Sequence, residues 1–140
     1  MPGYSGTPLA KKLGIKNNFR AALLHVPDEV KSELREALSK CQIQNTVAHA
    51  KRDLDFIFLF VKSRAALELD LVPAAKAPAP AGMLWISWPK KTSGVVTDLT
   101  GDTVRESGLA AGLVDIKVCA VDEVWSGLKF VIPVKNRQKQ

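Results

Sequence analysis

The longest hydrophobic run of the chain lies near its middle, in the stretch Leu54 to Val61. A strand with one face in water alternates apolar and polar residues, whereas a continuous apolar run is typical of a central strand covered by helices on both faces. A buried helix segment is the alternative, but the run is short and mostly aromatic or β-branched. Because side chains alternate along a strand, we expect two buried sets: Phe56, Phe58 and Phe60 on one side, and Ile57, Leu59 and Val61 on the other.

Three elements are predicted before this run. Residues 9–13 form a short helix, for which Thr7 is a suitable cap and Gly14 a suitable stop. Residues 19–26 are mostly apolar and predict a strand. Asp28 can cap the helix that follows, whose apolar positions recur at intervals of three and four. These positions are Val30, Leu34, Ala37 and Leu38.

The pattern after the central run predicts a helix, a loop and a strand. Ser63 can cap a helix that continues to Val72 and ends at Pro73. The Ala/Pro-rich stretch from Pro73 to Ala81 has neither a helical nor a strand period, so we expect a loop there. Residues 82–88 then predict a second buried strand, which Pro89 stops.

A helix and a hairpin complete the predicted elements. Thr97 or Thr100 can cap a helix that reaches about Ala111. Residues 114–121 and 128–134 predict two strands, and the short turn between them leaves room only for a hairpin.

The order of these elements predicts the fold class. Strands that alternate with helices indicate a three-layer, doubly wound, mostly parallel α/β sheet, here ending in an antiparallel hairpin. Residues 43–47 are too close to the central strand for a parallel crossover, so we expect an antiparallel or edge strand or an extended connection. We expect one α/β domain over residues 1–134 and a basic flexible tail over residues 135–140.

The net charge of +6 could indicate a nucleic-acid partner, but its distribution along the chain weakens that interpretation. Residues 1–20 carry four basic and no acidic side chains, residues 135–140 carry three more basic ones, and the rest has 13 basic and 14 acidic residues. The excess therefore belongs to the ends. No nucleic-acid motif or aromatic and basic interleaving accompanies it, which argues against a nucleic-acid partner.

Several other classes find no support in the sequence. No apolar run approaches the ~20 residues that cross a bilayer, and the opening MPGYSG does not resemble a signal peptide, so we expect a cytoplasmic protein without a membrane partner. Cys41 and Cys119 have no metal or redox spacing, and His49 has no ligand-type residues at metal spacing, so we expect no metal site.

The element order over roughly residues 19–134 resembles the class I S-adenosylmethionine-dependent methyltransferases, which implies a Rossmann-like sheet. In that family an acidic residue and a Gly-x-Gly loop follow the first strand, and an acidic residue closing the second strand holds the ribose hydroxyls. Here the stretch Leu24 to Asp28, LHVPD, stands at the first strand end without a glycine, and no acidic residue clearly closes the second strand. We therefore expect the fold without the cofactor.

Three sequence blocks carry a second resemblance, which spans nearly the whole chain. They are YSGTPLAKKLGI (residues 4–15), SWPKK (residues 87–91) and VDEVWSGLK (residues 121–129). These blocks resemble a family of small bacterial proteins with a domain of unknown function. The resemblance implies no activity.

The fold class predicts where a ligand would bind. In open α/β sheets, ligands bind outside the carboxyl ends of the parallel strands, and cations there could meet a helix start at residues 97–100. This combination suits an anion such as a phosphate or carboxylate, although adjacent lysines in a loop also occur on ordinary solvated surfaces. The candidate anion-binding residues are Lys90, Lys91, Ser93, Arg64, Trp125 and Ser126.

Catalytic patterns are weaker than this binding pattern. His25 with Asp28 could act as a base and its orienting group, although Asp28 also suits a cap, and Ser63 and Ser126 lack a nucleophile elbow. We therefore favour a non-catalytic methyltransferase-like module that holds a small anionic ligand or a protein partner at the carboxyl ends of the strands. The alternative is an enzyme of unrecognised type, such as a divergent methyltransferase, at the same place.

Overall fold

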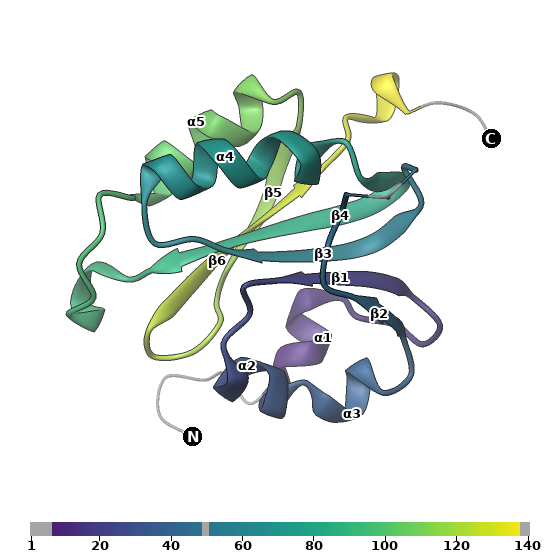
Figure 1. Ribbon diagram of the computed structural model, residues 1–140, viewed down its shortest axis with the longest axis horizontal. Coiled ribbons are helices and arrows are strands. Elements are labelled where there is room, and N and C mark those ends of the chain that lie inside the picture. Colours follow the sequence, from purple (N-terminus) through teal and green to yellow (C-terminus); the bar gives the residue numbers. More distant parts are fainter. Residues whose placement is uncertain (1–6, 49–50, 138–140) are drawn as a thin grey trace.

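The computed structural model describes residues 7–48 and 51–137 of the chain. In these ranges six strands form one sheet: β1 (Arg20–Leu24), β2 (Gln42–Gln44), β3 (Leu54–Phe60), β4 (Pro78–Pro89), β5 (Val114–Ala120) and β6 (Trp125–Val131). Their order across the sheet is β2-β1-β3-β4-β6-β5 (Figure 1). The strands β1 to β4 run parallel to one another, whereas β6 runs antiparallel to both β4 and β5.

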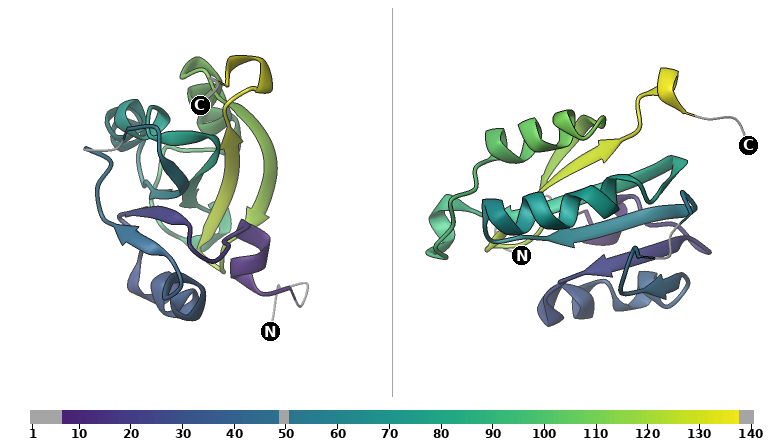
Figure 2. Two further views of the ribbon diagram at one scale, coloured as in Figure 1. Left: turned by 90° about the vertical axis from the view of Figure 1, so that its right-hand side faces the viewer. Right: turned by 45° about the horizontal axis from the view of Figure 1, so that its top comes forward.

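Helices cover both faces of this sheet. They are α1 (Leu9–Leu13), α2 (Asp28–Glu33), α3 (Arg35–Leu38), α4 (Arg64–Ala75) and α5 (Gly101–Ala110), and short 3₁₀ turns occur at η1 (Lys91–Ser93) and η2 (Val134–Asn136). Figure 1 and Figure 2 show α4 and α5 against one face of the sheet and α1, α2 and α3 against the opposite face. The predicted three-layer, doubly wound α/β sheet that ends in an antiparallel hairpin is confirmed.

The central strand is β3, as the hydrophobic run predicts. It pairs with β1 on one side and β4 on the other, and every residue from Phe56 to Val61 is at most 3% exposed. The predicted alternation is also confirmed, because the two sets of side chains belong to separate cores. Phe56, Phe58 and Phe60 pack with α1, α2 and α3, whereas Ile57, Leu59 and Val61 pack with α4 and α5.

Three of the predicted helix boundaries are confirmed by their cap geometry. Ser63 Oγ accepts a hydrogen bond from the amide of Ala66 (3.1 Å), and Thr100 Oγ1 accepts one from the amide of Thr103 (3.2 Å). Gly14 ends α1 with a φ of 82°, a left-handed conformation that glycine adopts without a steric penalty. These side chains satisfy amides that a helix start would otherwise leave unpaired.

The other two predicted caps are wrong. The N-caps of α1 and α2 are Pro8 and Pro27, and neither helix start has a side-chain cap hydrogen bond, so Thr7 and Asp28 do not cap. Asp28 instead lies in the first turn of α2, where the helix dipole favours a carboxylate. The predicted single helix is also divided at Leu34, whose φ of −95° and ψ of 2° separate α2 from α3.

Two further predicted boundaries, both based on prolines, are wrong. Pro73 does not end the helix but lies within α4, which continues to Ala75. A proline removes one backbone donor, and α4 extends only two residues beyond it. The predicted loop from Pro73 to Ala81 is wrong in its second part, because β4 already begins at Pro78, which pairs with Leu54 ahead of a register irregularity. Proline is tolerated in this first strand position.

The short segment at residues 43–47 forms part of an edge strand. β2 covers Gln42–Gln44 and pairs in parallel with β1, not with β3, so α2 and α3 provide the crossover that a parallel pair requires. The edge-strand interpretation is confirmed and the antiparallel one is wrong. The second hairpin strand begins at Trp125, earlier than the predicted residue 128, because the residues from Trp125 onward pair with the end of β4.

A buried indole joins α1 to the sheet. Trp85 in β4 is fully buried, and its Nε1 donates a hydrogen bond to the carbonyl of Leu13 (3.0 Å). The bond satisfies the one polar atom of the indole and also one of the terminal carbonyls of α1. This contact fixes the position of a helix that is too short to be stable alone.

The C-terminal segment is described only in part. η2 and Arg137, whose Nε donates to the carbonyl of Ile132 (3.0 Å), occupy the beginning of the predicted tail. Residues 138–140 and His49 lie outside the described residues, so the flexible tail and the domain boundary at residue 134 stay predictions. Of the helices in the described ranges, none combines the length and apolar character that a bilayer crossing requires.

Candidate functional site

The carboxyl ends of β1, β3 and β4 meet at one edge of the sheet, which we call the C-terminal edge, and β6 begins there. Pro89 at the end of β4 pairs with Trp125 at the start of β6. The amide of Lys90 donates to the carbonyl of Val124 (2.7 Å). The predicted placement of Lys90 and Trp125 at a common edge is therefore confirmed.

A cavity of about 670 Å³ opens at the C-terminal edge. The rings of Phe60 and Trp125 belong to its wall, where they meet edge to face with centroids 4.8 Å apart. The other apolar residues that line it are Pro27, Val61, Ala66, Val95 and Val124. Its size and mostly apolar lining are those of a small-molecule site.

Four ionisable side chains complete the lining of this cavity. His25 Nε2 lies 3.4 Å from Asp70 Oδ2, and Lys62 and Glu29 are the other two. His25 and Asp70 also line a neighbouring cavity of about 500 Å³, so their pair borders both spaces. The structure thus pairs His25 with Asp70 of α4 and not with Asp28, the partner suggested by the sequence.

His25 has an unusual backbone conformation for a residue with a side chain. Its φ is 62°, in the left-handed region that glycine adopts most readily and that histidine reaches at some steric cost. The residue follows β1 directly, and its side chain is 67% exposed. An imidazole therefore projects from the strand end at a backbone position where a glycine would leave space.

Asp122 holds Trp125 in place at the cavity. Its Oδ1 accepts hydrogen bonds from the amides of Val124 and Trp125, both at 2.8 Å. Trp125 is only 7% exposed and packs against Phe60. The predicted hairpin places Trp125 in the turn between its two strands, but the structure makes it both a core residue and part of the cavity wall.

The structure gives Arg64 partners within the chain. Its amide donates to Oδ1 of Asp98 (2.8 Å), and its Nε lies 3.5 Å from Oε1 of Glu68. A carboxylate of the chain therefore already interacts with the start of α4, the kind of position where a bound anion is favoured.

Ser93 and Ser126 also have contacts within the chain. Ser93 Oγ donates to the carbonyl of Lys90 (2.7 Å) and accepts from the amide of Val95 (3.2 Å), which shapes η1. The carbonyl of Ser126 accepts a hydrogen bond from Ser87 Oγ (2.7 Å). Lys91 is exposed. Of the six predicted site residues, only Trp125 lines the cavity.

Lys62, Phe60 and Asp70 are among the lining residues that sequence reasoning missed. Lys62 and Phe60 stand at the end of the central strand, so the rule that ligands bind at strand ends could have found them. Asp70 lies well inside α4, and no local signal links it to His25. The pair depends on how α4 packs beside β1, which a single sequence does not reveal.

Metal and thiol chemistry gain no support from the described residues. In residues 7–48 and 51–137, no three His, Cys, Asp or Glu side chains gather as metal ligands would. Burial raises the pKa of Cys119, while Lys12 and Lys117 act in the opposite direction. A thiol with a raised pKa is mostly protonated at neutral pH, which disfavours a nucleophilic role.

Comparison with known families classifies the chain. The profile of the family described as "Protein of unknown function (DUF3052)" matches residues 10–134. The chain belongs to this family. Among curated proteins, none matches the sequence.

Solved structures similar to this DUF3052 protein include methyltransferases. A SAM-dependent methyltransferase from Aquifex aeolicus has a TM-score of 0.56 at 15% identity, over 89% of this chain and 88% of its own. Magnesium protoporphyrin IX methyltransferase from Synechocystis PCC 6803, solved with bound SAH, has 0.57 at 8% identity, over 89% and 78%. A TehB-like SAM-dependent methyltransferase from Corynebacterium glutamicum has 0.54 at 10% identity, over 94% and 90%. These likenesses establish a methyltransferase-like Rossmann fold.

The residues at the first two strand ends do not fit the cofactor of that fold. His25 takes the left-handed position after β1 with a side chain, where the methyltransferase pattern has glycines for close backbone approach. After β2 the chain continues with Asn45, Thr46, Val47 and Ala48, which include no acidic side chain for the ribose hydroxyls. We derive no methyl-transfer step from this site.

We therefore expect calorimetry to detect no stoichiometric micromolar binding of S-adenosylmethionine. The imidazole of His25 occupies the approach to the end of β1, and the closing acid is missing after β2. His25→Gly tests the first of these reasons, because it removes the side chain and relieves a left-handed conformation that costs about 1 kcal/mol. Tight 1:1 binding by the unmodified protein would contradict this expectation.

Proposed function

We propose that this DUF3052 protein is a non-catalytic, methyltransferase-like module that binds a small anionic ligand at the C-terminal edge of its sheet. The observation that carries the proposal is the cavity of about 670 Å³ whose lining includes Phe60, Trp125 and Lys62. Aromatic walls offer apolar contact to a ring, and a lysine offers a charged donor to an anionic group. Together they suit an anion attached to a ring.

Other charges at this edge support an anionic ligand. Lys90 and Lys91 follow the end of β4, next to the hairpin turn that holds Trp125. Of the two carboxylates in the lining, Asp70 lies within 3.4 Å of His25 Nε2, and a protonated imidazole there would offset its charge. Arg64, Ser93 and Ser126 would then shape the rim, since they make contacts within the chain. The same features suit an acidic segment of a protein partner.

Titration followed by tryptophan fluorescence tests the proposed site. We expect adenosine monophosphate, which joins a phosphate to a ring system, to produce a saturable change, and adenosine to bind more weakly. Lys62→Gln should weaken binding of the nucleotide by about tenfold, because a charge-assisted hydrogen bond is lost. Lys40→Gln, which removes an exposed lysine outside the cavity lining, is the matched control.

Three outcomes would contradict the proposal. They are a flat titration with nucleotides and simple anions, equal binding of adenosine and its phosphate, and equal weakening by Lys62→Gln and Lys40→Gln. Melting temperatures of both variants show whether they are folded.

The second candidate function is an enzyme that uses the same cavity. The observation that favours it is the His25–Asp70 pair, since a carboxylate 3.4 Å from an imidazole can orient a general base. Incubation of a bound compound with the protein, followed by mass spectrometry, separates the two candidates. Conversion that His25→Gln abolishes while binding persists would establish the enzyme, whereas binding without conversion supports the module.

A further inference from the structure

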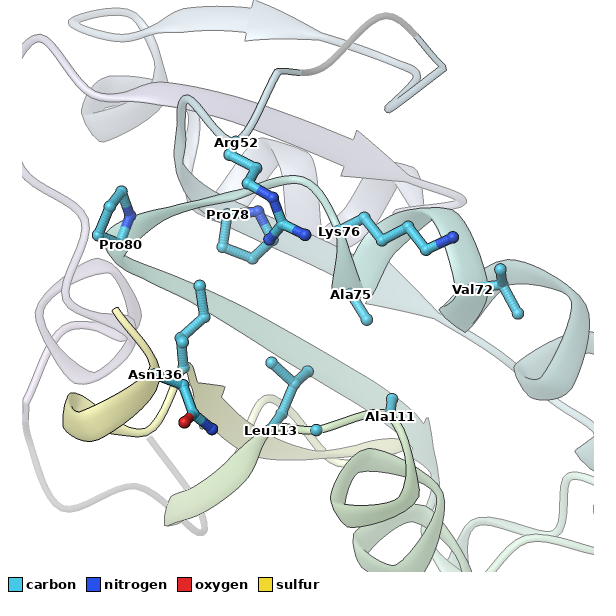
Figure 3. A pocket seen from close by; sticks show the side chains of 11 residues that line it. Arg52, Val72, Ala75, Lys76, Pro78, Pro80, Ala111, Leu113 and Asn136 are labelled. Atoms are coloured by element: carbon cyan, nitrogen blue, oxygen red, sulfur yellow. The ribbon is translucent and has the colours of Figure 1, made fainter. Parts of the chain in front are cut away.

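A second concave site lies at the opposite edge of the sheet, where β4 begins and α4 and α5 end (Figure 3). Its volume is about 440 Å³, within the range of small-molecule pockets. None of its lining residues lines either cavity at the C-terminal edge. The site is therefore separate from the proposed function, and a conclusion about it does not depend on that function.

Apolar side chains form about half of the wall of this second cavity. Val72 and Ala75 come from the last part of α4, Pro78 begins β4, and Leu113 and Ile132 flank the two strands of the hairpin. Val72 is 58% exposed, so the fold leaves part of this apolar surface open to water. An apolar body that covers it would gain the free energy of removing that surface from water.

The charged lining residues are both cations. Arg52 and Lys76 line the cavity, and no acidic residue does. Figure 3 shows these two on one side, across from Leu113 and Asn136. Among the residues that the structure describes, neither cation takes part in an ion pair. Arg137, whose Nε donates to the carbonyl of a lining residue, adds a third positive charge nearby.

The C-terminal ends of α4 and α5 affect the electrostatic potential in this cavity and so the position of a bound anionic group. Helix C-termini carry partial negative charge, which repels anions. Several of their terminal carbonyls are already bonded: the amide of Ala77 donates to Ala74, and the amide of Leu113 donates to Gly108. Within the lining, the side chains that attract negative charge are those of Arg52 and Lys76, and Lys76 directly follows the end of α4.

We propose that this cavity binds a small organic anion with an apolar body. The anionic group, a carboxylate or a phosphate, interacts with Arg52 and Lys76, and the body packs against Pro78, Leu113 and Ile132. Two cations that form no ion pair among the described residues, beside an apolar wall, complement such a molecule in both charge and polarity. A neutral or cationic molecule of the same shape lacks the attraction to Arg52 and Lys76.

Amide NMR spectra of the full chain, titrated with decanoate and decyl phosphate, test this proposal. We expect saturable shifts at Gly112 and Leu113 with at least one of the two, and the stronger ligand identifies the preferred anionic group. Decyltrimethylammonium, which has the same chain and the opposite charge, should leave these signals unchanged. The double variant Arg52→Gln, Lys76→Gln should weaken binding by about tenfold or more.

Two further variants separate charge from shape. Lys40→Gln, which removes an exposed lysine outside the lining, should bind as the unmodified chain does. Ala111→Trp places a large side chain at an exposed lining position and should block binding although both cations remain. Equal shifts with the cationic compound, no saturable shift at Gly112 and Leu113, or unchanged affinity in the double variant would overturn the proposal.

Discussion

Replacing Phe58 by alanine should lower the free energy of unfolding by about 3–5 kcal/mol, a large share of the roughly 5–15 kcal/mol of a small domain. Phe58 is fully buried, and its ring contacts those of Phe56 and Phe60 at centroid distances of 5.6 and 4.6 Å. Because β3 is hydrogen-bonded on both sides, its backbone is not free to move into the space left by the ring. Urea denaturation followed by circular dichroism measures the loss.

Leu69→Ala is the matched control for this variant. Leu69 is also a large apolar residue, but it lies on α4 with 75% of its surface exposed, so its truncation should change stability by less than about 0.5 kcal/mol. A loss below about 1 kcal/mol for Phe58→Ala would show that β3 is not the central strand.

Gly108→Ala should destabilise the protein by about 1–3 kcal/mol. Helix propensity alone predicts the opposite sign, since alanine is favoured over glycine by about 1 kcal/mol in a helix interior. A Cβ at position 108 would overlap the ring of Phe130, which is fully buried and has little room to move. The glycine therefore allows α5 to pack closely on β6, and thermal and urea denaturation measure the cost of the added methyl group.

The same helix supplies a control for the glycine substitution. A Cβ at Gly101, the first residue of α5, would lie 3.5 Å from Cζ2 of Trp88, an ordinary van der Waals distance. Gly101→Ala should therefore be neutral or slightly stabilising. If Gly108→Ala proved equally neutral, the close approach of α5 to Phe130 would not limit the packing.

Local signals in the sequence were sufficient for most of the fold. The run from Phe56 to Val61 identified the central strand, and Ser63 and Thr100 marked helix starts that their hydroxyl groups do cap. Prolines misled the assignment where tertiary pairing outweighed local preference. Pro73 remains inside α4, and Pro78 begins a strand because Leu54 is available as its neighbour.

The candidate site was less predictable because its contacts join distant parts of the chain. The rule of strand ends placed Lys90 and Trp125 correctly at one edge. Nothing near Arg64 in the sequence indicates that Asp98, 34 residues away, accepts a hydrogen bond from its amide. The partner of His25 is more remote still, and a carboxylate inside a helix does not indicate in the sequence which strand end it will lie beside.

The indole bond between Trp85 and Leu13 has a consequence for the protein during its synthesis. The two residues are 72 positions apart, so α1 leaves the ribosome long before the residue that holds it has been made. The pairing of β1 with β3 is delayed as well, because β3 begins only at Leu54. Both elements lack these particular native partners throughout that interval, when a nascent chain is most exposed to aggregation and to chaperones. The first elements to be translated therefore depend, for their final positions, on residues that are translated much later.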